Sequence, residues 1–162
     1  MSLASFLSQI RRSFKVGPDG STLKLNWESE VAARVAAKTI AVDRPLSDQE
    51  YAIARWLLLN ANPPASAFLP QLDVARVSGH CGCGCPTADL KLPEGTPRAE
   101  PRDNRVGDAI GEVDGKMVGV MLLQSDGYLT CLEIYDLSDI EHPYGLPDLS
   151  SLRPWDVATP TT

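Results

Sequence analysis

The chain has 162 residues, of which 43% are hydrophobic and 22% charged, values typical of a globular protein that buries a core without disulfides or metal. The formal net charge of -6 is unevenly divided, with +3 in residues 1–46 and -9 in residues 47–162. Because acidic surface repels phosphate groups, this balance argues against nucleic-acid binding and favours a basic protein as partner.

Membrane insertion and secretion are also disfavoured by the sequence. No apolar run approaches the roughly 18 residues that a transmembrane helix needs. Arg11 and Arg12 follow the first apolar stretch, whereas a secretory signal has its basic residues first. We therefore expect no membrane contact and a cytoplasmic location, in which the four cysteines are free thiols or metal ligands.

The N-terminal third predicts two helices. An apolar stripe at steps of three and four predicts an amphipathic helix over residues 1–16, which is either docked on the domain or a partner-binding arm. An Ala-rich stretch predicts a second helix over 27–41, ended by Asp43-Arg44-Pro45. The stripe of the first helix comprises Leu3, Phe6, Leu7, Ile10 and Phe14.

The next segment gives the clearest helix signal. Ser47 and Glu50 have the spacing of a capping box, which predicts a helix over about 48–61 that Asn62-Pro63-Pro64 stops. A short helix over 65–72 is expected to follow.

From residue 74 onward the apolar residues alternate, as they do in strands. Asp114-Gly115 predicts a type I′ hairpin turn, and Ser125-Asp126-Gly127 a second turn. Proline and charge in residues 93–105 predict an exposed loop, and the proline-rich tail after Leu137 predicts no long element. The expected strands cover residues 74–77, 87–92, 106–113, 116–123 and 128–135.

Together these elements predict an α+β fold, with N-terminal helices packed on one face of a four- or five-stranded, mostly antiparallel sheet. We expect a single domain over residues 17–155, preceded by the helix over 1–16 and followed by a flexible tail over 156–162.

The most unusual feature is the run His80-Cys81-Gly82-Cys83-Gly84-Cys85-Pro86. In a flat strand its three thiols would face one side, with Cα atoms about 6.6 Å apart. Zinc requires closer sulfurs, each about 2.3 Å from the metal, and the glycines could bend the backbone enough to bring them together. One hypothesis is therefore a metal site, for zinc in particular, formed by His80, Cys81, Cys83 and Cys85, with Cys131 or His142 as other fourth ligands.

Two other interpretations of this run stay open. Cysteine behaves as a small hydrophobic residue, so the three thiols could pack inertly in the interior, as we expect of Cys131 in its strand. Alternatively, Cys83 could act as a nucleophile with His80 as its base, which would make the protein a cysteine-dependent enzyme. No other catalytic motif is present in the sequence.

Several stretches resemble a family of small bacterial cytoplasmic proteins whose activity is uncharacterised. The similar residues include Phe68-Leu69-Pro70-Gln71-Leu72, Cys81-Gly82-Cys83-Gly84-Cys85-Pro86-Thr87 and Tyr128-Leu129-Thr130-Cys131. The resemblance covers about residues 45–150 and implies a shared fold but no activity. The first functional prediction is therefore a non-catalytic protein-interaction module of the immunity or antitoxin kind, with zinc binding and cysteine-dependent catalysis as the alternatives.

Overall fold

The structure, a computed structural model, describes residues 39–100 and 103–155. These residues fall within one compact unit of the chain. The helix predicted over 1–16, most of the helix predicted over 27–41 and the tail predicted over 156–162 lie outside the described residues.

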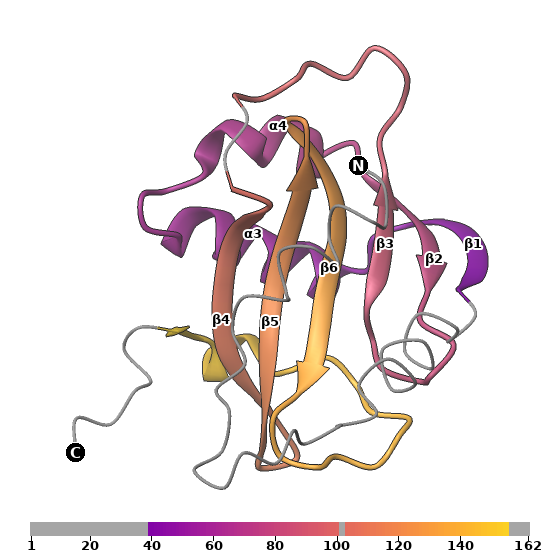
Figure 1. The fold of residues 1–162 in the computed structure, drawn as a ribbon, viewed down its shortest axis with the longest axis vertical. Helices are drawn as coiled ribbons and strands as arrows, with labels where there is room; N and C mark the ends of the chain where they lie inside the picture. The colour runs from indigo at the N-terminus through magenta and orange to yellow at the C-terminus, as the bar shows by residue number, and fades with distance from the viewer. Residues whose placement is uncertain (1–38, 101–102, 156–162) are drawn as a thin grey trace, which may run out of the picture. The chain divides into compact units, whose positions relative to one another are not determined.

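The described chain is organised around one seven-stranded sheet in which every neighbouring pair of strands is antiparallel (Figure 1). The strand order is β1-β2-β3-β6-β5-β4-β7. The long meander β4-β5-β6 therefore has the shorter strands β1, β2 and β3 on one side and the short strand β7 on the other. The strands are β1 (Ile40–Pro45), β2 (Arg76–His80), β3 (Ala88–Lys91), β4 (Arg105–Val113), β5 (Lys116–Ser125), β6 (Tyr128–Asp136) and β7 (Arg153–Pro154).

Two α-helices, α3 (Asp48–Asn60) and α4 (Leu69–Leu72), lie between β1 and β2 in the chain. The predicted capping box is confirmed, because the Ser47 hydroxyl accepts from the Glu50 N–H at 3.2 Å and the Glu50 carboxylate accepts from the Ser47 N–H at 2.7 Å. The short helix expected over 65–72 is divided into the 3-10 turn η1 (Ser66–Phe68) and α4; a second such turn, η2, covers Leu149–Ser151. Among the described residues no helix has both the length and the apolar character that crossing a bilayer demands.

The predicted fold class is wrong. The sheet has seven strands where four or five were expected, and the described chain begins with a strand, so its two short helices are not N-terminal. Residues 40–45 pair with β2, where the end of a helix was predicted. Val42 and Arg44 are half-buried while Ala41 and Asp43 are exposed, which is the alternation of a strand. Six residues are too few to reveal this alternation in the sequence, because an Ala-rich stretch that favours a helix lies next to them.

The predicted meander is confirmed, with slightly longer strands. Asp114 and Gly115 both have positive φ, at 50° and 77°, as a type I′ turn requires. Asp126 and Gly127 repeat this conformation at the β5–β6 turn, with φ of 52° and 82°. Local turn chemistry therefore sets the register of the three longest strands.

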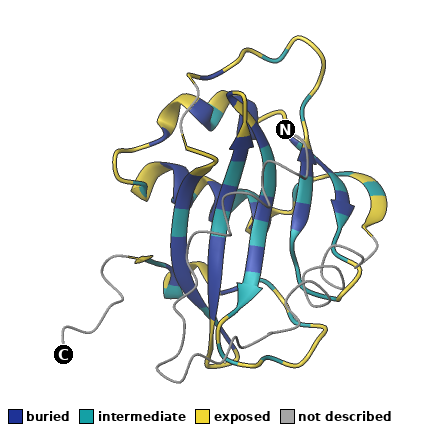
Figure 2. Cartoon of the chain, in the orientation of Figure 1, coloured by how far each residue is buried: buried dark blue, intermediate teal, exposed yellow. Residues whose placement is uncertain are grey.

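The core lies where α3 crosses the central strands, whose buried residues are dark blue in Figure 2. Gly107 in β4 makes the close approach possible, because a Cβ there would stand 2.8 Å from the Leu57 carbonyl oxygen. Buried apolar side chains from α3 and the sheet include Ile53, Leu57, Leu58, Val77, Val118, Val120, Leu122, Leu132 and Ile134. At about 25 cal/mol per Å² of buried apolar surface, this cluster is the main source of stability, and no cysteine belongs to it.

Candidate metal centre

The three clustered cysteines lie in the connection between β2 and β3, residues 81–87, which we call the cysteine loop. The loop is closed at its base by the Cys81 N–H, which donates to the Thr87 carbonyl at 3.3 Å. Inside it, the Gly84 N–H donates to the Cys81 carbonyl at 3.4 Å, and Gly84 has a φ of 91°. A left-handed residue at this point reverses the backbone, which is why glycine is required there.

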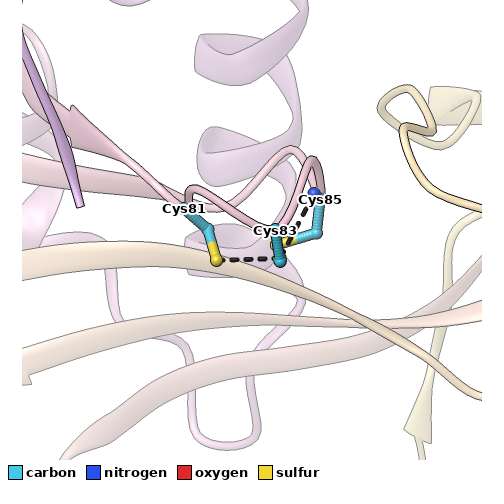
Figure 3. Close-up of side chains that lie close together, drawn as sticks. All are labelled: Cys81, Cys83 and Cys85. Carbon is cyan, nitrogen blue, oxygen red and sulfur yellow. Dashed lines mark hydrogen bonds between the residues drawn. The ribbon is translucent and has the colours of Figure 1, made fainter. Parts of the chain in front are cut away.

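This reversal brings the three sulfur atoms together, so the loop does not have the flat-strand spacing. The Sγ atoms of Cys81, Cys83 and Cys85 all lie within 4.8 Å of one another. Those of Cys81 and Cys83 are 2.8 Å apart, and the Cys85 N–H donates to the Cys83 sulfur at 3.5 Å (Figure 3). Three thiols in this arrangement could hold a metal ion.

The prediction that these cysteines pack in the hydrophobic interior is wrong. Cys83 is exposed, and Cys81 and Cys85 are half-buried. The loop is anchored to β6 through Thr87, whose hydroxyl donates to the Ile134 carbonyl and accepts from the Ile134 N–H, both at 3.0 Å. The buried part of the sheet resumes only at Ala88, the first residue of β3.

A second segment holds the cysteine loop from outside. The Tyr144 N–H donates to the Gly84 carbonyl at 3.3 Å, and Pro143 lies so close to Gly84 that an added Cβ would be 3.2 Å from its Cα. The Tyr144 hydroxyl in turn donates to the Ile134 carbonyl at 3.4 Å, which ties this segment to β6. Sequence reasoning missed Pro143 and Tyr144, because they follow β6 and only the fold brings them to the loop.

The surroundings of the cluster shift the pKa values of Cys81 and Cys83 in opposite directions. Burial, with a further contribution from Cys83, raises the pKa of Cys81 to about 12. Burial acts in the same direction on Cys83, but hydrogen bonds from the Cys81 thiol and the Cys85 backbone outweigh it and lower the pKa of Cys83. Of these two thiols, Cys83 is thus the more ready to bind a metal or react.

His80, predicted as a fourth ligand and as a catalytic base, points to different partners. Its Nε2 atom lies 3.2 Å from Nη2 of Arg44, and Arg44 forms a bidentate ion pair with the buried Glu50, both N–O distances being 2.7 Å. Arg44 is always a donor, so Nε2 of His80 is the acceptor in this contact. The structure therefore does not place His80 with the three sulfurs or pair it with Cys83.

Cys131, the fourth cysteine, stands opposite Asp89 on the neighbouring strand β3. It is half-buried, so its predicted place in the core is only partly correct. Burial, reinforced by the negative charges of Asp89 and Glu133, raises the pKa of Cys131 to about 12. His142, the other histidine, lies edge-on to Tyr144 with ring centroids 4.9 Å apart and belongs to the segment beside the loop.

Within the described ranges, the residues that could act together as metal ligands are therefore Cys81, Cys83 and Cys85. Three thiolates supply soft ligands, which select zinc, Cu(I) or iron–sulfur chemistry over magnesium and calcium. No protein-family model, curated protein or solved structure matches the chain.

Proposed function

We propose that the protein binds a thiophilic metal ion, with zinc as the first candidate, through the thiolates of Cys81, Cys83 and Cys85. The observation that carries this proposal is the convergence of three sulfur atoms within 4.8 Å. In a tetrahedral zinc site with Zn–S bonds of about 2.3 Å, the sulfurs are about 3.8 Å apart. Shifts of the order of 1 Å within a glycine-containing loop would bring the cluster to this geometry.

The surroundings of the loop favour an ion that the fold does not need. All three ligands come from one five-residue segment, so the ion would not link distant parts of the chain as it does in a structural zinc finger. The loop is already closed by the backbone hydrogen bonds Cys81–Thr87, Gly84–Cys81 and Tyr144–Gly84. We therefore expect the folded protein to take up and release the ion without unfolding.

Exposure of Cys83 leaves one side of the cluster open. Zinc with three protein ligands keeps a fourth position for water or for a donor from another molecule. This arrangement suits an exchangeable or accessible ion. It supports the metal-binding interpretation better than that of a non-catalytic interaction module, and the basic protein partner stays a prediction.

Elemental analysis of the purified full-length chain tests the proposal. After loading with zinc under reducing conditions and removal of excess, we expect about one zinc per chain by the site geometry. Cys83→Ser should lower the affinity at least about 100-fold, because even residues behind metal ligands commonly contribute 10- to 100-fold.

Cys131→Ser is the matched control. It removes a thiol on the neighbouring strand without touching the three clustered sulfurs, and it should retain the full zinc content. A wild-type protein that holds no zinc after this loading, and no Cu(I) or iron after the same treatment with those metals, would contradict the proposal. So would equal loss of metal in the Cys83→Ser and Cys131→Ser variants.

A further inference from the structure

Two of the three clustered sulfurs have a relationship that metal binding does not require. The Sγ atoms of Cys81 and Cys83 lie 2.8 Å apart, with one glycine between the two residues. A disulfide bond brings sulfur atoms to about 2.05 Å. A further approach of less than 1 Å, in a segment whose middle residue has no side chain, would join them.

The two residues also differ in their exposure to solvent. Cys83 is exposed and receives a hydrogen bond from the Cys85 N–H, while Cys81, the first residue after β2, is half-buried. A small oxidant in solution can therefore reach Cys83 first. Cys81 is then placed to attack any adduct that forms there.

We propose that Cys81 and Cys83 form a reversible redox pair, which a low-molecular-weight disulfide of the glutathione class oxidises to an intramolecular disulfide. The thiolate of Cys83 attacks one sulfur of the oxidant, giving a mixed disulfide at Cys83 and releasing one small thiol. Cys81 Sγ, losing its proton to the departing small thiolate, then attacks Cys83 Sγ, forming the Cys81–Cys83 bond and releasing the second small thiol. Two protein thiols are oxidised, one small disulfide is reduced to two thiols, and the two protons pass to these products or to water.

The resulting bond should be easy to reduce. It closes a ring across a single intervening residue, and strained or exposed disulfides are the labile ones. A dithiol reductant such as dithiothreitol should therefore restore both thiols. This property separates a switch from a structural disulfide.

Oxidation would also control the metal site, an extension that rests on the function proposed above. A disulfide sulfur is not a thiolate, so oxidation removes two of the three ligands and leaves Cys85 alone. Conversely, an ion bound to all three sulfurs blocks the attack by Cys83. Metal and disulfide should exclude each other.

The first test uses the metal-free full-length chain, oxidised glutathione in graded excess, acid quenching, alkylation and peptide mass spectrometry. We expect the loss of two free thiols, a crosslink assigned to Cys81 and Cys83, and recovery of four thiols after dithiothreitol. Four unreacted thiols at high oxidant, or a dominant crosslink through Cys85 or Cys131, would overturn the proposal.

Two variants test the order of events. In Cys81→Ser/Cys85→Ser the exposed Cys83 has no neighbour in the cluster to resolve the adduct, so a stable glutathione adduct should accumulate at Cys83. Cys131→Ser should form the crosslink as the wild type does. An adduct mainly at Cys131 in the double variant would contradict the assigned roles.

The second test adds one equivalent of zinc before the oxidant. Protection of Cys81 and Cys83, by at least about tenfold in rate, would support mutual exclusion. If the protein fails to bind zinc yet forms the crosslink, the proposed metal function fails and the redox pair stands. If zinc binds but the metal-free protein forms no crosslink, the redox proposal fails and the metal function stands.

Discussion

The backbone N–H of Tyr144 donates a hydrogen bond to the carbonyl of Gly84 across 3.3 Å, joining the segment after β6 to the middle of the cysteine loop. Residues sixty positions apart in the chain are therefore neighbours at the proposed metal site. Together with the two hydrogen bonds inside the loop, this contact holds the backbone that carries the three sulfurs.

Substitution of Gly84 by alanine should weaken metal binding. Gly84 has a φ of 91°, which costs an L residue about 1–2 kcal/mol, and its new Cβ would be 3.2 Å from Pro143. The loop must shift, so we expect zinc affinity to fall about tenfold or more, measured by competition with a chromophoric chelator.

Gly95→Ala is the control for this change. Gly95 has a similar φ of 81° and has no atom within 4 Å of an added Cβ, so it carries the backbone cost without the collision. Its zinc affinity should equal that of the wild type. Equal loss of affinity in both variants would show that the Gly84–Pro143 contact does not position the site.

Glu50→Gln should destabilise the fold near neutral pH. Burial acts to raise the pKa of Glu50, but hydrogen bonds from Arg44 and the Ser47 N–H outweigh it and lower this pKa. A carboxylate with a depressed pKa contributes stability above its unfolded value of about 4.3 and loses it as the pH falls through the folded pKa. We expect a loss of about 1–3 kcal/mol in free energy of unfolding at pH 7, and a smaller loss at pH 3, which lies below the unfolded pKa.

Urea unfolding at both pH values measures this difference. The exposed pair of Glu112 with Arg153, 3.3 Å apart, provides the comparison. Glu112→Gln should cost about 0.5 kcal/mol or less, because solvent screens exposed ion pairs. A loss in Glu50→Gln that is the same at pH 7 and pH 3 would contradict the assigned charge interaction.

Gln71→Leu should be costly although the two side chains are similar in size. Gln71 is buried, and its amide donates to the carbonyls of Gly127 at 2.7 Å and Pro97 at 3.0 Å. Its side-chain oxygen accepts from the Leu129 N–H at 2.9 Å. Leucine would leave these backbone groups without their partner, so we expect the free energy of unfolding to fall by about 2–4 kcal/mol.

Chemical denaturation of Gln71→Leu beside Gln49→Leu checks this expectation. Gln49 is exposed and makes one bond, to the Pro147 carbonyl at 3.1 Å. Its replacement should change stability by less than about 1 kcal/mol. Similar losses in the two variants would argue against a structural role of the buried amide.

Sequence reasoning succeeded where the signal was local. Ser47 and Glu50 predicted the start of α3, and Asp114-Gly115 predicted the hairpin, because each motif satisfies its own backbone groups within four residues. It failed for Ile40–Pro45, whose strand state depends on pairing with β2 more than thirty residues later. No local sequence pattern predicts the pairing of β3 with β6 or of β4 with β7 either.

At the candidate site, too, the sequence indicated the local features and missed the long-range contacts. One hypothesis from the sequence placed Cys81, Cys83 and Cys85 in a metal site, and its glycines indicated that the backbone could bend. The sequence did not reveal that Gly84, and not Gly82, takes the left-handed conformation, or that Pro143 and Tyr144 support the loop. His80 was predicted as a ligand because it directly precedes Cys81 in the sequence, but its imidazole lies beside Arg44.

Alkylation rates should distinguish the Cys83 thiol from the Cys131 thiol. Hydrogen bonds from Cys81 and the Cys85 N–H, acting against burial, lower the pKa of the exposed Cys83, whereas burial raises the pKa of Cys131 to about 12. Since the thiolate reacts, Cys83 should be labelled at least about tenfold faster than Cys131 by iodoacetamide at pH 7. Peptide mass spectrometry of the metal-free protein gives both rates, and a Cys131 as fast as Cys83 would contradict this order.

X-ray absorption spectroscopy at the zinc edge of the loaded, reduced protein tests the central claim most directly. If Cys81, Cys83 and Cys85 hold the ion, the spectrum should show three sulfur atoms at about 2.3 Å and one lighter atom in the fourth position. The same measurement on Cys131→Ser should be unchanged. A first shell of nitrogen and oxygen atoms alone in the wild-type protein would contradict the proposal that the converging thiols form a metal site.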